Sequence, residues 1–137
     1  SPQPLPEPAN DLLFTLHGDE RGPWAVGGYH QGVVWRLNAP SWIPVQLDRV
    51  PPLNGVTVRA SEVIAVGQQG SILTIQRDPM GHPLSYQLKR VAELETITLH
   101  AITQFRGELW SVGGDLNEMT DGVIVSDHQD EPIVEVW

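Results

Sequence analysis

The feature that most constrains the fold of this chain is a five-residue phrase that occurs three times. Its copies are Trp24–Gly28, Ile64–Gln68 and Trp110–Gly114. Each copy begins with a large apolar residue, a small residue, a valine and a glycine, in that order. The copies are 40 and 46 residues apart, and a period of this length is typical of repeat architectures. We therefore predict three copies of one supersecondary unit.

The match between the three units continues upstream of the phrase without a gap. A leucine precedes the glycine of each phrase by 14 positions: Leu13, Leu53 and Leu99. Two residues after this leucine, each unit has a small side chain: Thr15, Gly55 and Ala101. An ungapped match of 15 residues in three copies indicates that aligned residues occupy equivalent positions in the three units.

The units also have the residue pattern of short β-strands. Aliphatic, β-branched and aromatic residues fill runs such as 33–37, 71–75 and 84–88, and turn residues separate the runs. The 13 glycines and 12 prolines interrupt the chain too often for long helices. The one stretch rich in helix formers, residues 88–95, is predicted to connect the second unit to the third. We predict four strands in each unit.

Four-stranded antiparallel sheets that recur every 40 to 50 residues are typical of β-propeller blades. We therefore predict an all-β fold with three four-stranded antiparallel blades at residues 11–50, 51–97 and 98–137, after a proline-rich tail at residues 1–10. The small residues at positions 15, 55 and 101 would lie on the innermost strands, beside the axis. The glycine of each phrase would end a second strand, where the chain turns with little steric room.

The pattern Trp-Ala-Val-Gly-Gly, followed by Gly-Val-Val or Gly-Val-Ile, resembles a known group of sequences. It is similar to bacterial β-propeller repeat proteins of the BNR-like and photosystem-assembly-factor-like type, and the double glycines are similar to those of Kelch repeats. The resemblance covers residues 11–137. It implies the propeller architecture and a bacterial source, and it implies no particular activity.

Three blades are too few for a closed propeller, which typically has four to eight. An arc of three blades exposes an apolar sheet face at each end, and such a patch indicates an interface. We expect a homodimer that closes a six-bladed ring, with two alternatives: another subunit supplies the missing blades, or the chain is part of a longer protein. The tail at residues 1–10 is either a linker or an arm that reaches a neighbouring subunit.

The charge balance limits the partners. Asp and Glu number 17 against 8 Lys and Arg, which gives a formal charge of −9. This acidic balance disfavours nucleic acid and anionic membrane surfaces, and no apolar run is long enough for a membrane span. We expect a soluble protein. The chain contains no cysteine, which excludes disulfides and leaves the compartment open, with a periplasmic or secreted bacterial location as one option.

Loops on a rigid scaffold usually carry binding residues, so we expect any ligand site in the loops that follow the three phrases. The candidate ligand-binding residues are His30, Gln68, Gln69, Asp115, Asn117, Glu118 and Asp121. Within this set, Asp115, Asn117 and Asp121 offer oxygen atoms that suit calcium. The alternative is a solvated acidic loop without a cation, and we expect no other cofactor.

The five tryptophans divide into two groups. Trp24 and Trp110 are aligned and are expected to pack between blades, whereas Trp42 and Trp137 lie in outer strands and are candidate partner contacts.

The favoured function is a non-catalytic interaction or scaffold module. The alternative is part of a glycan-acting hydrolase or lyase with paired carboxylates at the axis. The candidate carboxylates for that chemistry are Asp19, Glu20, Glu62 and Glu108. The sequence contains no nucleophile elbow, phosphate loop or dinucleotide-binding fingerprint.

Overall fold

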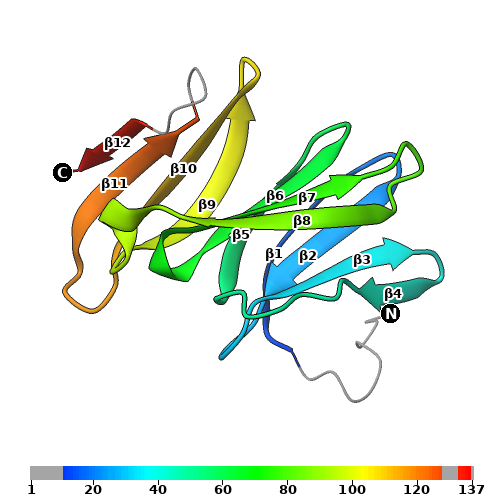
Figure 1. Cartoon of the computed structure of the whole chain (residues 1–137), viewed down its shortest axis with the longest axis horizontal. Coiled ribbons are helices and arrows are strands. Elements are labelled where there is room, and N and C mark those ends of the chain that lie inside the picture. The colour runs from blue at the N-terminus through cyan, green and yellow to red at the C-terminus, as the bar shows by residue number, and fades with distance from the viewer. Residues whose placement is uncertain (1–10, 128–132, 137) are drawn as a thin grey trace.

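The computed structural model of the chain contains three four-stranded antiparallel sheets, which follow one another in chain order (Figure 1). It describes residues 11–127 and the backbone of residues 133–136. The prediction of an all-β fold with three blade-like sheets is confirmed. Within the described residues, no helix has the length and apolar character that a bilayer crossing requires.

Each blade is a simple meander in which consecutive strands pair. Blade 1 consists of β1 (Leu13–Asp19), β2 (Gly22–Gly27), β3 (Val33–Asn38) and β4 (Ser41–Pro44). Blade 2 consists of β5 (Leu53–Val58), β6 (Glu62–Gly67), β7 (Ser71–Arg77) and β8 (Pro83–Arg90). Blade 3 consists of β9 (Thr98–Phe105), β10 (Glu108–Asp115), β11 (Thr120–Ser126) and β12 (Ile133–Val136).

The glycine of each phrase lies where the first strand of the blade begins to pair with the second. Its partner in the register is the aligned leucine, and each blade has a register shift at this point. A Cβ added to this glycine would lie 1.9 to 2.0 Å from the carbonyl oxygen that precedes the leucine. These glycines are Gly27, Gly67 and Gly113. The close backbone approach therefore explains why the phrase requires glycine.

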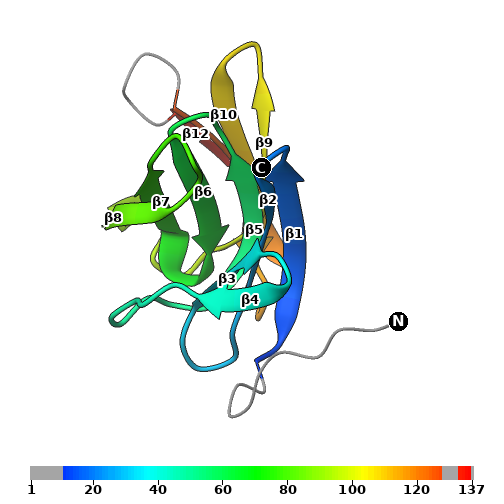
Figure 2. The ribbon, with the colours of Figure 1, turned by 90° about the vertical axis from the view of Figure 1, so that its right-hand side faces the viewer.

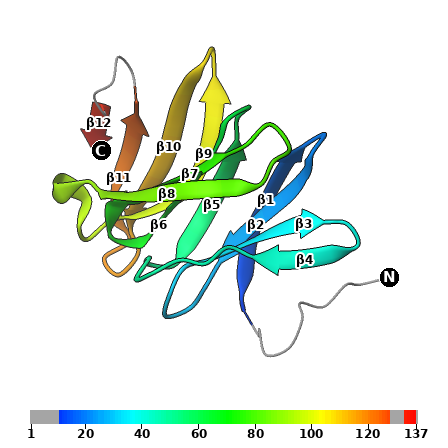
Figure 3. The same cartoon turned by 45° about the vertical axis from the view of Figure 1, so that its right-hand side comes forward.

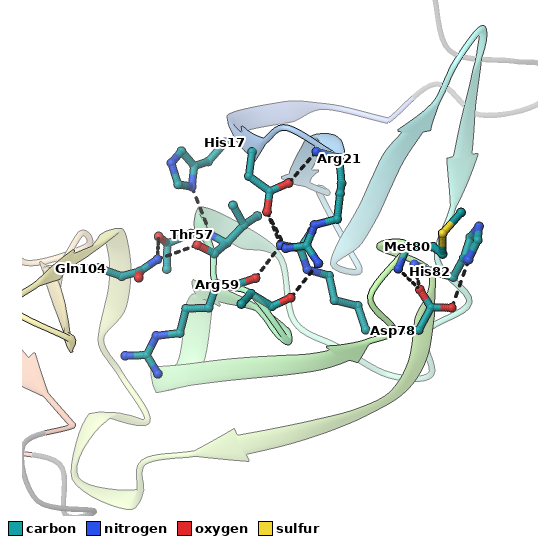
Figure 4. Close-up of polar contacts among 12 residues, drawn as sticks. His17, Arg21, Thr57, Arg59, Asp78, Met80, His82 and Gln104 are labelled. Carbon is teal, nitrogen blue, oxygen red and sulfur yellow. Dashed lines mark hydrogen bonds and ion pairs between the residues drawn. The ribbon is translucent and has the colours of Figure 1, made fainter.

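The first strands of the three blades lie side by side, with β5 between β1 and β9 (Figure 2). Thr15 Oγ1 donates a hydrogen bond to the carbonyl of Asn54, and the Val58 amide donates to His17 Nδ1 at 3.1 Å (Figure 4). On the other side of β5, Gln104 Nε2 donates to Thr57 Oγ1 at 2.9 Å. Small residues at the aligned inner positions permit this approach.

Two apolar clusters fill the spaces between neighbouring blades. The cluster between blades 1 and 2 includes Trp24, Val26, Val56, Val63 and Ala65. The cluster between blades 2 and 3 includes Val66, Leu94, Leu99, Val123 and Val125. Blade 2 contributes one face to each cluster, because its successive side chains point to opposite faces of the sheet.

The predicted connection at residues 88–95 is wrong in its first part. Strand β8 continues to Arg90, and the connection that follows contains only a short 3₁₀ turn at Ala92–Leu94. Leu94 in this turn is buried in the cluster between blades 2 and 3. The helix formers Leu88, Lys89 and Arg90 are in a strand because pairing with β7 outweighs their intrinsic preference.

Candidate functional site

The loops that join the second and third strands of each blade lie along one edge of the molecule (Figure 1). Two of them are pinned to the connections between blades. The Gly32 amide donates to the carbonyl of Val50 at 2.6 Å, and the Gly70 amide donates to the carbonyl of Ile97 at 2.9 Å. This edge therefore presents loops whose ends are held by the scaffold.

His30, Gln68 and Gln69 are all exposed on this edge. The ring of His30 contacts the ring of Tyr29 edge to face, with 4.5 Å between the ring centroids. Gln69 has a left-handed backbone with φ of 59° in the turn Gln68–Gly70. These side chains are accessible to a ligand, although His30 comes from a different loop than the two glutamines.

The acidic loop of blade 3 uses one of its carboxylates to hold its own backbone. Asp115 Oδ1 accepts hydrogen bonds from the amides of Asn117 at 2.9 Å and Glu118 at 3.1 Å. Asn117, Glu118 and Asp121 are exposed. In residues 11–127, no group of three or more His, Asp and Glu side chains is placed to hold a metal ion.

The predicted partner contacts on the outer strands have different outcomes. Trp42 lies on β4, opposite Leu37 of β3, and is half-buried. Trp137 lies outside the described residues. The two tryptophans expected between blades also differ, because Trp24 is buried whereas Trp110 is only half-buried.

The candidate catalytic carboxylates lie at the hairpin tips, where arginines bind two of them. Asp19 Oδ2 accepts from Arg21 at 2.7 Å and from Arg77 at 2.5 Å. Partial burial raises the pKa of Asp19, but the hydrogen bonds from the two arginines outweigh this effect and hold the pKa well below its usual range. Glu62 binds Arg59 at 3.0 Å. Asp19 therefore forms one ion pair within blade 1 and one with blade 2, whereas Glu62 forms an ion pair within blade 2.

A histidine–carboxylate pair occurs at the turn between β7 and β8 (Figure 4). Asp78 Oδ2 lies 3.1 Å from His82 Nδ1, while Oδ1 accepts from the amides of Met80 and His82 at 2.9 Å each. The hydrogen bond from the His82 amide is the main cause that lowers the pKa of Asp78. This pair closes a turn at the outer hairpin of blade 2 and is not on an innermost strand.

A cleft between blades 2 and 3, which we call the blade 2/3 cleft, was not anticipated from the sequence. It has a volume of about 220 Å³. Its wall is formed by Ile64, Val66, Ile72, Ile102, Leu109 and Val125. Charged side chains at its rim are Arg59, Glu62, Lys89 and Asp127. A wider and more open groove of about 560 Å³ lies between the outer strands β4 and β8 of blades 1 and 2.

The outward faces of blades 1 and 3, which we call the flanks, expose positions that are buried elsewhere. Val26 and Val66 are both 0 % exposed, whereas the aligned Val112 of blade 3 is 46 % exposed. On the opposite side, Leu53 is 0 % exposed and the aligned Leu13 of blade 1 is 40 % exposed. Leu16 of β1 is 58 % exposed as well. A neighbouring blade covers the buried positions, whereas none of the described sheets packs on the flanks.

The flank of blade 3 also contains a polar atom without a partner. Trp110 Nε1 is buried and has no acceptor among the described residues. A buried donor without an acceptor costs about 1–3 kcal/mol. A neighbour with an acceptor at this point would remove that cost.

These features define a class of protein: an all-β chain of three blade-like, four-stranded sheets with a cleft between two of them and two apolar flanks. Comparison with protein-family models, curated proteins and solved structures gives no match to this chain.

Proposed function

We propose that the chain is a non-catalytic interaction module of the β-propeller type, and that further blades cover its two flanks. The comparison of aligned valines carries this proposal, because the same side chain is fully buried in two blades and half-exposed in the third. Exposed apolar side chains of this kind indicate an interface. The resemblance to bacterial propeller repeats supports the same assignment.

The preferred source of the missing blades is a second copy of the chain. Two arcs of three blades would form a six-bladed ring, within the usual range for propellers. In that ring, blade 3 of each copy would pack on blade 1 of the other copy, so two equivalent contacts would close the assembly. Another subunit that provides blades is the alternative.

The loop edge is the proposed binding surface of the module. His30, Gln68, Gln69 and the acidic loop at residues 115–121 are accessible there, and the scaffold fixes the ends of the loops. Such a surface suits recognition of a partner through polar contacts.

Glycan cleavage has less support than recognition. Glycoside hydrolysis requires two carboxyl groups on either side of the scissile bond, of which one acts as an acid with a raised pKa. Asp19 and Glu62 are instead paired with arginines, and the pKa of Asp19 is lowered.

Light scattering coupled to gel filtration tests the ring proposal. The chain has a mass of 15.1 kDa, and we expect the wild type to elute at twice this mass. Val112→Asp places a charge on the flank of blade 3, and Leu16→Asp places one on the flank of blade 1. Each variant should elute as a folded monomer, while the control Met80→Asp, at an exposed position in the β7–β8 turn, should remain dimeric.

A wild-type monomer at all concentrations would contradict a second copy as the source of the blades. A dimer that persists in both flank variants would show that the copies associate through another surface.

A further inference from the structure

The blade 2/3 cleft is formed by the same aligned positions that are filled between blades 1 and 2. Its walls include Ile102, Leu109 and Ser111 of blade 3. The aligned residues in blade 2 are Val56, Val63 and Ala65, and they belong to the cluster that contains Trp24. The indole of Trp24 therefore occupies, between blades 1 and 2, the position that corresponds to this cleft.

Two residue differences between the aligned blades explain why a cleft forms at this interface. Trp24 corresponds to Ile64 in blade 2, and Arg36, which pairs with Trp24 across the strands, corresponds to Thr74. Both changes replace a large side chain with a smaller one. The side chains of blade 3 compensate only in part. Ile102 and Leu109 are each one methylene larger than the aligned Val56 and Val63, whereas Val125 is one methylene smaller than the aligned Leu73.

The polarity of the cleft selects a neutral, largely apolar occupant. The wall is formed by aliphatic side chains, and the Ser111 hydroxyl already donates to the carbonyl of Ala101 at 2.8 Å. The rim has two cationic and two anionic side chains, so neither positive nor negative charge predominates at the entrance. Arg59 is fixed there by Glu62 at 3.0 Å and by the carbonyl of Gly107 at 3.0 Å. An ordered guanidinium is a favourable neighbour for an aromatic face.

We propose that the blade 2/3 cleft binds a neutral planar aromatic group of about the size of indole. The group is part of a free small molecule, because a cleft of about 220 Å³ between two blades has room for one ring system. An aromatic side chain of a partner presents the same ring and is the other outcome that the test distinguishes. This inference is independent of ring closure, because both walls of the cleft belong to the described part of one chain.

Titration calorimetry with two probes tests the proposal. Indole represents the free ring, and N-acetyltryptophanamide represents the ring on a peptide backbone. We expect the wild type to bind at least one probe. If only indole binds, the cleft accepts a free small molecule and not a ring on a peptide backbone. If both probes bind, an aromatic side chain of a partner can occupy the cleft as well.

The variant Ile64→Trp restores the residue that blade 1 has at the aligned position. It should fill the cleft, raise the melting temperature and abolish probe binding. Met80→Trp adds a tryptophan at an exposed turn outside the cleft and should bind the probes as the wild type does. If Ile64→Trp does not fold, Thr74→Arg, which introduces the side chain that Arg36 supplies in blade 1, is measured in the same way and should also abolish binding.

Two results would overturn the proposal. One is the absence of binding of either probe to the wild type up to the solubility limit. The other is equal affinity in the wild type and in the folded cleft-filling variant, which would place the bound probe elsewhere on the molecule.

Discussion

The two interfaces between neighbouring blades are built from aligned positions, yet they are filled differently. Between blades 1 and 2, Trp24 is buried in a continuous apolar cluster. Between blades 2 and 3, the aligned Ile64 leaves a cleft. The comparison shows that aligned blade faces leave a cleft in one interface and bury an indole at the corresponding position in the other, while the inner strands β1, β5 and β9 lie side by side in both (Figure 3).

The charged contacts at the hairpin tips also differ between the two interfaces. Between blades 1 and 2, the fully buried side chain of Arg77 in blade 2 binds Asp19 of blade 1. Between blades 2 and 3, Arg59 of blade 2 lies 3.8 Å from Asp127 of blade 3, and both side chains are partly exposed. The first interface should therefore depend strongly on its ion pair and the second one weakly, since exposed pairs contribute little.

The largest effect should come from removing apolar volume in the filled interface. Leu53→Ala deletes a side chain that is 0 % exposed and should lower the free energy of unfolding by about 2–5 kcal/mol. The aligned variant Leu13→Ala, on the flank of blade 1, should cost less than about 1 kcal/mol when both changes are made in the monomeric Val112→Asp background. Urea denaturation in that background measures the difference, and equal costs would contradict the assignment of Leu13 to an uncovered flank.

The next effect should come from the buried arginine. Arg77→Met removes the hydrogen bonds to Asp19 and to the carbonyl of Arg59, and we expect a loss of about 2–3 kcal/mol. Arg59→Met, which removes the more exposed contacts of the other interface, should cost about 1 kcal/mol or less. Thermal and chemical unfolding of both variants measure the two losses of stability. A larger loss in Arg59→Met than in Arg77→Met would contradict the stronger role of the ion pair between blades 1 and 2.

The pH dependence of stability should reflect the same ion pair. The pKa of Asp19 is lower in the folded chain than in the unfolded chain, so its contribution is complete above the unfolded pKa of about 3.9 and is lost as the pH falls toward the folded value. We expect the wild type to lose about 1–2 kcal/mol more than Asp19→Asn between about pH 4 and pH 2. Parallel loss in both proteins would show that Asp19 is not the responsible group.

The smallest effect should come from the contact between inner strands. A Cβ on Gly55 would lie 3.0 Å from the Cα of Ala101, so Gly55→Ala should destabilise the chain by about 1 kcal/mol. Ala101→Ser changes the exposed, aligned residue of blade 3 and should leave the stability of the isolated chain within about 0.5 kcal/mol. Hydrogen exchange of β5 and β9 amides would locate the change, and an effect outside these strands would contradict the assignment.

Much of the fold could be predicted because its signals are local. The spacing of the phrases indicated the three sheets, and the alternation of residues indicated strands. The prediction for residues 88–95 was wrong because helix preference is also local and strand pairing with β7 overrode it. The ligand-binding role of the loop residues stays a prediction, although His30, Gln68 and Gln69 are exposed. Local signals could not show that arginines bind Asp19 and Glu62, because Arg77 is 58 residues from Asp19 in the chain.

The sequence by itself determined the strand pattern, the positions of the turns and the need for glycine where the first two strands of a blade approach closely, because each of these depends on neighbours within one blade. Only the tertiary structure decided which copy of an aligned position is buried, which arginine reaches Asp19 and where a cleft remains. These outcomes depend on how side chains from two different blades share one space. The sequence of a single blade does not specify its neighbour.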